Sequence, residues 1–327
     1  MLIVNPNVCI DRTIGVGELV PGNVHRTGSA ATTLGGKGVN VARVARSFGR
    51  PGTILGFLPT RDAARLRELA EGERADLRGI DVDGAVRVAT IVIETSGRVT
   101  VLNEPGVTTG SADWEALVAL VPGLASGHES LACSGSLPPG SPPDAYARVV
   151  LAARRAGLRT VVDATGPALA GALEVGPDVV SPNLSEAEAL LHGTSGEEVE
   201  PTGVDVALRA AAAVVGLRAR GARHVIVSAG SHGAAFDDGA DVAWCAAPVV
   251  EVVNPIGAGD SLVGGLVHAL EGGRPWTDAV RFALTVASAS CEDPLAGGVD
   301  VGRVTHLLAG LPPSTVVGAG LPGPAER

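Results

Sequence analysis

Basic residues are scarce in this sequence, and lysine is almost absent. The 327 residues include 25 Lys and Arg against 35 Asp and Glu, which gives a formal net charge of −10. Lys37 is the single lysine, and the other 24 basic residues are arginines. A protein that binds nucleic acid needs a basic face toward the phosphates, so this balance argues against a nucleic-acid partner.

Cysteines, aromatic residues and long apolar runs are scarce too. The four cysteines lie far apart without a Cys-x-x-Cys pair, which argues against a zinc site or a disulfide framework and predicts four buried thiols. Aromatic residues make up 2% of the chain, and its tryptophans show no stacking pattern. No run of about 18 uncharged apolar residues occurs, so we expect no membrane-spanning helix. Residues 1–6 lack the features of a signal peptide, and we expect a cytoplasmic protein.

What the chain does contain is an alternation of strands and helices. Such alternation predicts an α/β fold with a mainly parallel sheet and helices on both faces. We expect strands at 2–4, 53–58, 130–133, 160–163, 178–181 and 224–228, and helices at 39–48, 61–72, 111–121, 142–156, 167–173, 185–191, 203–220 and 275–291.

Two segments, 8–34 and 86–107, show no helical periodicity. The second contains two β-like runs joined by a turn at 95–97, which is typical of a hairpin. Both segments are therefore expected to form a small separate sheet. From about residue 312 the chain is rich in Pro and Gly, and we expect a disordered tail over 312–327. The acidic residues Asp62, Glu68, Glu71, Glu73 and Asp76 are interpreted as a solvated helical face.

The strongest chemical signal lies between Val252 and Ser261. An apolar segment, predicted to be a strand, runs into Gly257-Ala258-Gly259-Asp260, and an apolar helix follows. Small residues at a helix N-terminus let backbone N–H groups face an anion, where the helix dipole also favours negative charge. Asp260 is then either an ordinary acidic cap or a base that takes a proton from a hydroxyl attacking phosphorus.

A second signal surrounds the single lysine in Gly35-Gly36-Lys37-Gly38-Val39-Asn40. Its three glycines permit close approach of a ligand to the backbone, and Lys37 supplies one positive charge. The alternative is a flexible hinge with an exposed lysine. Two such helix N-termini in one chain favour a phosphate site.

Both segments resemble the signatures of the PfkB (ribokinase-like) sugar kinases. Further resemblance to the phosphosugar branch, which holds 1-phosphofructokinases and tagatose-6-phosphate kinases, lies in Asn5-Pro6, Ile10-Asp11, 103–106 and 134–140. Residues 182–186 resemble the Asn-x-x-Glu element of the family, and 228–234 resemble its nucleotide-binding turn. The resemblance implies a ribokinase-like three-layer α/β/α domain over 1–311, in which 8–34 and 86–107 form a β-sheet lid.

The resemblance also implies site residues. Asp260 would be the general base, with Gly257, Ala258 and Gly259 as the anion hole for the transferred phosphoryl group. The sugar and its phosphate would be held by Asp11, Arg26, Gly36, Lys37, Asn40, Arg87, Asn103 and Ser136. The nucleotide would contact Asn183, Ser228, Gly230, Gly233, Ile256, Gly257, Gly259 and Ser261, and Glu186 would organise Mg²⁺.

The expected activity is ATP- and Mg²⁺-dependent phosphorylation of a sugar phosphate, with fructose 1-phosphate as acceptor at its 6-hydroxyl. Alternatives are tagatose 6-phosphate, fructose 6-phosphate or an unusual sugar phosphate of specialised metabolism. A sugar-phosphate sensor without turnover is the non-enzyme alternative. The resemblance further implies a homodimer formed through the lid.

Overall fold

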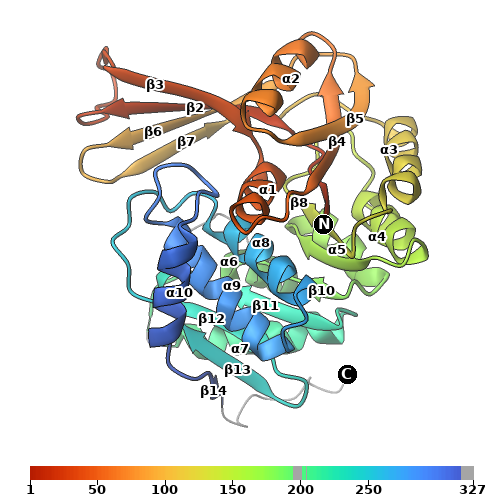
Figure 1. Ribbon diagram of the computed structural model, residues 1–327, viewed down its shortest axis with the longest axis vertical. Helices are drawn as coiled ribbons and strands as arrows, with labels where there is room; N and C mark the ends of the chain where they lie inside the picture. The colour runs from red at the N-terminus through yellow and green to blue at the C-terminus, as the bar shows by residue number, and fades with distance from the viewer. Residues whose placement is uncertain (194–200, 204, 318–327) are drawn as a thin grey trace.

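The centre of the protein is one large, mostly parallel sheet (Figure 1). The computed structural model describes residues 1–193, 201–203 and 205–317. The ten strands have the order β14-β13-β12-β11-β10-β9-β8-β1-β4-β5, parallel from β5 to β11 and antiparallel from β11 to β14. Their bounds are β1 Leu2–Val4, β4 Thr53–Pro59, β5 Asp76–Val82, β8 Ser130–Ser134, β9 Arg159–Asp163, β10 Val179–Val180, β11 His224–Ser228, β12 Gly233–Asp237, β13 Val242–Ala246 and β14 Thr315–Val316.

Helices cover both faces of this sheet, because successive side chains of its buried strands point to opposite sides. In β1, Ile3 joins one apolar cluster while Leu2 and Val4 join the other. The expected three-layer α/β/α arrangement is thereby confirmed. The first cluster includes side chains of α1 Lys37–Ser47, α2 Ala63–Gly72, α8 Ala258–Glu271, α9 Trp276–Ser290 and α10 Val301–Gly310; the second includes those of α3 Ser111–Leu124, α4 Ala145–Arg155, α5 Gly166–Glu174, α6 Leu184–His192 and α7 Val206–Ala219.

A smaller sheet extends from one end of the main body (Figure 1). Its order is β3-β2-β6-β7, with β2 and β6 parallel and the outer pairs antiparallel. The strands are β2 Cys9–Val16, β3 Ser29–Gly35, β6 Arg87–Glu94 and β7 Val99–Asn103, so both helix-free segments contribute as expected. This four-stranded sheet is called the lid below.

Several expectations for the C-terminal half were wrong. The segment at Val252 and Val253 was expected to be a strand but is irregular chain, since no strand of the described structure pairs with it. Val252 and Val253 are 55% and 44% exposed. Strands β12 and β13 and helix α10 were not expected. The tail expectation is wrong for Thr315–Val316, which pair with β13 as β14, and residues 318–327 lie outside the described residues.

The expectations for three single residues, Asp76, Glu73 and Cys291, also need correction. Asp76 begins strand β5 instead of extending a helical face, and the Glu73 carboxylate is only 18% exposed in an ion pair with Arg43. Of the four thiols, Cys9, Cys133 and Cys245 are buried as expected, whereas Cys291 is half-buried. Within the described part of the chain, no helix is both long and apolar enough to cross a membrane.

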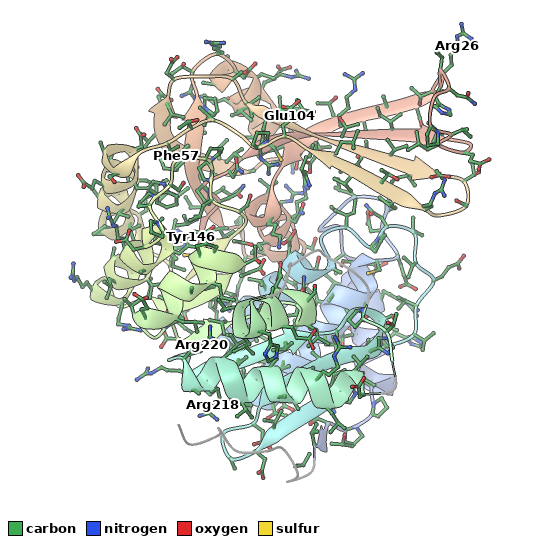
Figure 2. The ribbon with its side chains drawn as sticks, turned by 180° about the vertical axis from the view of Figure 1, so that it is seen from behind. Arg26, Phe57, Glu104, Tyr146, Arg218 and Arg220 are labelled. Carbon is green, nitrogen blue, oxygen red and sulfur yellow. The ribbon has the colours of Figure 1, made fainter. Side chains whose placement is uncertain are left out.

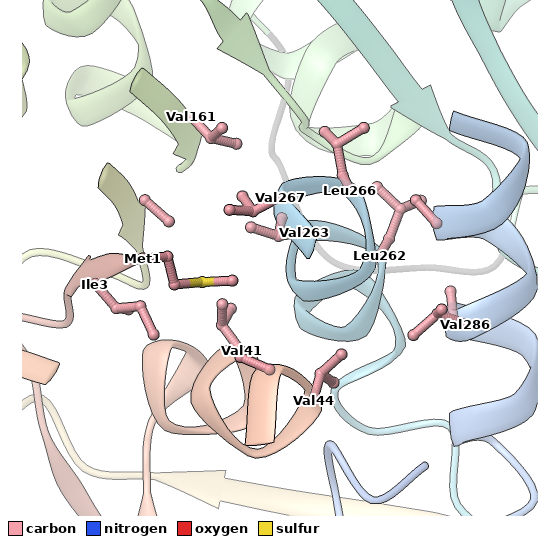
Figure 3. Packing of buried hydrophobic residues seen from close by; sticks show 14 of the residues in the cluster. Met1, Ile3, Val41, Val44, Val161, Leu262, Val263, Leu266, Val267 and Val286 are labelled. Atoms are coloured by element: carbon pink, nitrogen blue, oxygen red, sulfur yellow. The ribbon is translucent and has the colours of Figure 1, made fainter. Parts of the chain in front are cut away.

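Helix α8 lies between α1 and α9, which sets the position of its N-terminus (Figure 3). Two consecutive glycines make the close approach. A Cβ on Gly264 would lie 2.8 Å from the Cβ of Val44, and one on Gly265 would lie 2.9 Å from the Cβ of Val286. The α1 and α8 backbones therefore meet closely below the two glycine-rich helix starts.

We expect Gly264→Ala to lower the free energy of unfolding by about 1–3 kcal/mol, because the added methyl group overpacks the α1–α8 contact. The matched control is Gly123→Ala in α3, where an added Cβ meets nothing within 4 Å. That control should be neutral or stabilising by up to about 1 kcal/mol, since alanine favours the helix. Urea denaturation of both variants measures the difference, and equal stability of the two would contradict the packing argument.

Candidate active site

The candidate site lies at the carboxyl ends of the parallel strands, where the lid joins the main body. Open α/β sheets bind ligands in the crevice outside this edge. Asn5 follows β1, Gly135 follows β8, and Asp163 ends β9. Helices α1 and α8 begin at Lys37 and Ala258, so both glycine-rich segments predicted from the sequence are helix N-termini.

A direct hydrogen bond joins the two glycine-rich segments. The Asn40 amide Nδ2 donates to Asp260 Oδ2 at 2.7 Å, and both residues are buried. Gly257, the N-cap of α8, has a left-handed φ of 81°, and a Cβ there would lie 3.1 Å from Asn40 Nδ2. Gly257 therefore packs closely on Asn40, whereas Gly259 in the first turn of α8 has open space where a Cβ would lie, and one carboxylate is held beside this helix start.

The loop before α8 is fixed by Asn254. Its Oδ1 accepts from the Ile256 backbone N–H at 3.0 Å, and its Nδ2 donates to the Pro294 carbonyl at 3.0 Å. The backbone N–H groups of Val253 and Asn254 both donate to the Cys291 carbonyl. These bonds hold the irregular segment before Gly257 against the loop that follows α9.

The predicted sugar side is built from the root of the lid. Asp11 on β2 is 8% exposed, and the Cys9 thiol donates to its Oδ1 at 3.1 Å. A Cβ on Gly35 would lie 2.1 Å from that same oxygen, so only glycine leaves room for the carboxylate. Burial raises the pKa of Asp11, while the Cys9 hydrogen bond and the charges of Arg43 and Arg87 oppose the rise.

Glycine also makes room for Asn5 beside the lysine segment. Gly36 has a left-handed φ of 115°, and a Cβ there would lie 2.5 Å from Asn5 Nδ2. A Cβ on Gly38 would lie 2.6 Å from the Asn5 Cβ. The predicted substrate residue Gly36 is thus a backbone position where any side chain would displace Asn5.

The single lysine lies between two carboxylates. Lys37 Nζ is 3.9 Å from Asp163 Oδ2 and 3.8 Å from Glu186 Oε1, and its side chain is 37% exposed. Asp163 also accepts from the Ser134 hydroxyl at 3.3 Å. Sequence reasoning did not select Asp163, although its place at the carboxyl end of a predicted strand was the available signal.

Two predicted phosphate ligands from distant segments meet at Asn7. Arg87 Nε donates to the Asn7 carbonyl at 3.1 Å, and Asn7 Nδ2 donates to Ser136 Oγ at 3.1 Å. Asn7 Nδ2 also contacts the Pro105 carbonyl at 3.2 Å, which ties the loop after β7 to the site. Asn7 was missed because nothing in the local pattern distinguishes it from a turn residue.

One predicted substrate ligand is not brought into this group. Arg26 lies at the far tip of the lid and is exposed (Figure 2). Asn103, at the end of β7, is also exposed, but it pairs with Ala89 of β6, which pairs in turn with Asp11 of β2. Within one chain, the structure places the Arg26 side chain away from Lys37 and Asp260.

The predicted nucleotide residues line the neighbouring strand ends. Asn183 caps α6: its Oδ1 accepts from the Glu186 N–H, and Glu186 Oε2 accepts from the Asn183 N–H, each at 2.9 Å. Asn183 forms a parallel bridge with Ser228, and Gly230 lies in the short 3₁₀ turn Gly230–His232. Gly233 has a left-handed φ of 135°, and a Cβ there would lie 2.2 Å from the Cys245 carbonyl oxygen.

Three further predicted nucleotide residues lie at the N-terminus of α8 and are partly or fully exposed: Ile256, Gly257 and Gly259. Ser261 differs, because its side chain is fully buried and its Oγ has no hydrogen-bond partner among the residues that the structure describes. Its backbone N–H donates to the Gly257 carbonyl at 2.8 Å. Ser261 therefore contributes to the helix interior rather than to the exposed surface of the site.

The acidic residues present fit a magnesium ion. Among the residues that the structure describes, no group of three or more His, Cys, Asp or Glu side chains could hold a metal. Mg²⁺ is usually bound by one or two carboxylates together with substrate phosphates and water. Asp163 and Glu186, with side chains 6% exposed and both facing Lys37, supply that number of oxygen ligands.

This geometry can be compared with known proteins. The model of the pfkB family of carbohydrate kinases matches residues 5–300. The chain belongs to this family. Enzymes of this kind transfer a phosphoryl group to a sugar hydroxyl, which fits a carboxylate beside an anion-binding helix start.

Similar relatives cover most of the chain. A 1-phosphofructokinase of Rhodobacter capsulatus is 35% identical over 283 residues, 86% of either chain. A 1-phosphofructokinase of Haloferax volcanii is 35% identical over 289 residues, 88% of this chain and 90% of that one. The structure of phosphofructokinase-2 from Escherichia coli in complex with fructose-6-phosphate has a TM-score of 0.81 at 26% identity, covering 95% of this chain and 98% of that one.

The buried Asp11 carboxylate generates a stability prediction. Its raised pKa means that the charged form destabilises the fold. This loss of stability is complete above the raised pKa and absent below the ordinary value of 3.8. We expect Asp11→Asn to be more stable than the unsubstituted protein near pH 7, with the difference vanishing as the pH falls through the raised pKa. Urea denaturation over a pH series measures this.

The same variant should bind sugar less well, with a KM about 10-fold higher, because a charged acceptor of hydroxyl hydrogen bonds is lost. Asp113→Asn, at the capping box of α3, is the matched control and should leave KM unchanged. Lower stability of Asp11→Asn near pH 7 would show that Asp11 is a structural carboxylate.

Proposed function

We propose that this kinase transfers the γ-phosphoryl group of ATP, with Mg²⁺, to the 6-hydroxyl of fructose 1-phosphate. The observation that carries the proposal is the Asn40–Asp260 hydrogen bond, which holds one buried carboxylate at the start of α8. The 1-phosphofructokinase relatives and the presence of Lys37 favour an acceptor that already bears a phosphate.

Asp260 is the general base in this proposal. Phosphoryl transfer needs positioning, charge neutralisation and removal of the hydroxyl proton. The attacking hydroxyl gives its proton to Asp260 as its oxygen approaches phosphorus. The first-turn N–H groups near Gly257, Ala258 and Gly259 stabilise the negative charge that develops on the transferred group.

On the acceptor side, Asp11, Gly36 and Asn40 hold sugar hydroxyls. Lys37, Arg87 and Ser136 bind the existing phosphate, and the contacts through Asn7 keep the latter two close together. Lys37 is also near Asp163 and Glu186, so one ammonium connects the acceptor phosphate to the residues proposed for the metal.

On the donor side, Asp163 and Glu186 would hold Mg²⁺, which supplies charge neutralisation on the ATP phosphates. Asn183 fixes Glu186 through the capping box. Ser228, Gly230, Gly233 and Ile256 line the nucleotide, and the lid excludes water that would otherwise hydrolyse it.

We further propose a cytoplasmic homodimer formed through the lid. Exposed apolar side chains on and beside the lid support a second copy as the covering partner: Leu102 is 63% exposed, Val101, on the opposite face of β7, is 39% exposed, and Val24 in the loop between β2 and β3 is 89% exposed. Sedimentation in solution tests this proposal, and a monomer at all protein concentrations would contradict it.

Asp260→Asn should lower kcat by about 10²-fold or more, because the amide still accepts from Asn40 but cannot take a proton. Asp278→Asn is the matched control, since Asp278 is an acidic residue in the first turn of α9. ADP release in the presence of fructose 1-phosphate measures both. A near-normal rate for Asp260→Asn would leave it as an ordinary helix cap.

A panel of acceptors tests the role of Lys37. Turnover should be fastest with fructose 1-phosphate and weaker with tagatose 6-phosphate and fructose 6-phosphate. Lys37→Ala should raise KM for the phosphosugar roughly 10- to 100-fold, the effect of losing one charged hydrogen bond. Lys37→Arg should be intermediate, because arginine keeps the charge but not its geometry.

The panel separates the alternatives. Turnover restricted to unphosphorylated sugars, or an unchanged KM in Lys37→Ala, means that no acceptor phosphate binds at Lys37. Tight binding of a phosphosugar without ADP release would indicate a sensor.

A further inference from the structure

Arg43 is a buried cation next to the site that no step above uses. It lies on α1 one turn after Asn40 and is 3% exposed. Its guanidinium donates to Asn40 Oδ1 at 2.8 Å, to the Ala296 carbonyl at 3.1 Å and to the Leu34 carbonyl. Burial of an arginine requires that its donors be satisfied, and these bonds satisfy three of its five N–H donors.

Glu73 holds the other edge of the same guanidinium. Its Oε2 accepts from Arg43 Nε at 2.8 Å and its Oε1 from Nη2 at 3.0 Å. Glu73 Oε1 also accepts from the Leu34 backbone N–H at 2.8 Å. The bidentate pair therefore fixes the plane of the guanidinium against the end of lid strand β3.

The bond from Arg43 to Asn40 sets which way the amide points. A carboxamide carries an acceptor on one side and donors on the other. With Arg43 donating to Oδ1, the NH₂ group faces Asp260, where it donates at 2.7 Å. A flipped amide would place its oxygen against the Asp260 carboxylate and its NH₂ group against the Arg43 N–H donors, and both contacts are repulsive.

Arg43 also holds the chain that packs on Asn40 from the other side. A Cβ on Gly297 would lie 2.6 Å from the Asn40 carbonyl oxygen, and one on Gly257 would lie 3.1 Å from Asn40 Nδ2 and 3.3 Å from the Ala296 Cβ. The bond to the Ala296 carbonyl thus keeps this loop against both Asn40 and the start of α8.

We propose that Arg43, fixed by Glu73, is a positioning residue for phosphoryl transfer: it orients the Asn40 amide so that this amide holds the Asp260 carboxylate. The proposal rests on the role of Asp260 as base proposed above. The Arg43 side chain also joins the lid root at Leu34 to the N-terminus of α8. Arg43 itself touches neither the acceptor nor the donor.

Arg43→Met and Arg43→Lys test the proposal. Methionine removes every donor, and lysine keeps the charge beside Glu73 but cannot bond Leu34, Asn40 and Ala296 together. Both should lower kcat about 10-fold or more with little change in the KM for ATP, since misplacement of a reacting group affects the chemical step. If Arg43→Met does not fold, Arg43→Lys still gives the result.

The pH profile of kcat separates positioning from a structural role. A hydrogen bond donated to a carboxylate lowers its pKa, so a misdirected Asn40 should move the acid limb of kcat upward by roughly half a unit or more. Loss of folded enzyme would lower kcat without moving the limb. The matched control is Arg209→Met, which breaks another bidentate pair, with Glu188, and should leave kcat and the limb unchanged.

Glu73, Asp11 and Asp260 are charged groups near the Arg43–Asn40 hydrogen bond, and the charge of Arg43 opposes the rise in the pKa of Asp11 that burial causes. The double variant Asn40→Ala/Arg43→Met separates an effect of Arg43 through Asn40 from an effect through Asp11. If Arg43 acts through Asn40, adding Arg43→Met to Asn40→Ala moves the limb no further. A further shift in that background would assign the effect to Asp11.

An unshifted limb in Arg43→Lys with normal kcat overturns the proposal. Failure of the underlying function has a different signature. A near-normal rate in Asp260→Asn removes the base itself, whereas loss of activity in Asp260→Asn together with normal Arg43 variants removes only the positioning role.

Discussion

The hydrogen bond from Asn40 to Asp260 is the contact on which the site depends. It joins residues 220 positions apart, each in the first turn or two of its own helix. The bond forms only because α1 and α8 approach closely, and they do so through Gly264, which faces Val44. Glycine at that contact and at Gly257 is thus a requirement of packing and chemistry together.

The site combines a few buried charges with many backbone donors. The protein carries a net charge of −10, yet Lys37, Arg43 and Arg87 lie at or beside the strand ends where anions would bind. The carboxylates Asp11, Asp163 and Glu186 are buried among them. Such a balance suits a kinase with a phosphorylated acceptor, since the site must neutralise several phosphates without attracting anions elsewhere.

The lid connects to the site through its root. Cys9, Asp11 and Leu34 are all at the end of β2 or β3 nearest the main body, while Arg26 is at the tip. Contacts through Asn7 and Glu73 bind this root to the loop after β7 and to the end of α2. The lid root therefore carries Asp11, a proposed sugar ligand, and contacts Arg43, which donates to Asn40, another proposed sugar ligand.

The sequence by itself determined the α/β class, the two glycine-rich helix starts and the family, because these depend on local periodicity and on glycines in short motifs. It also indicated the small separate sheet, since two segments lacked helical periodicity. The tertiary structure alone decided that Glu73 is an ion-pair partner rather than a solvated residue, that Val252 and Val253 lie in an irregular loop, and that Asp163 and Asn7 belong to the site. Each of these depends on contacts between segments far apart in the chain, and a local pattern of apolar and polar residues contains no record of which distant group will neutralise a charge or pair with a strand.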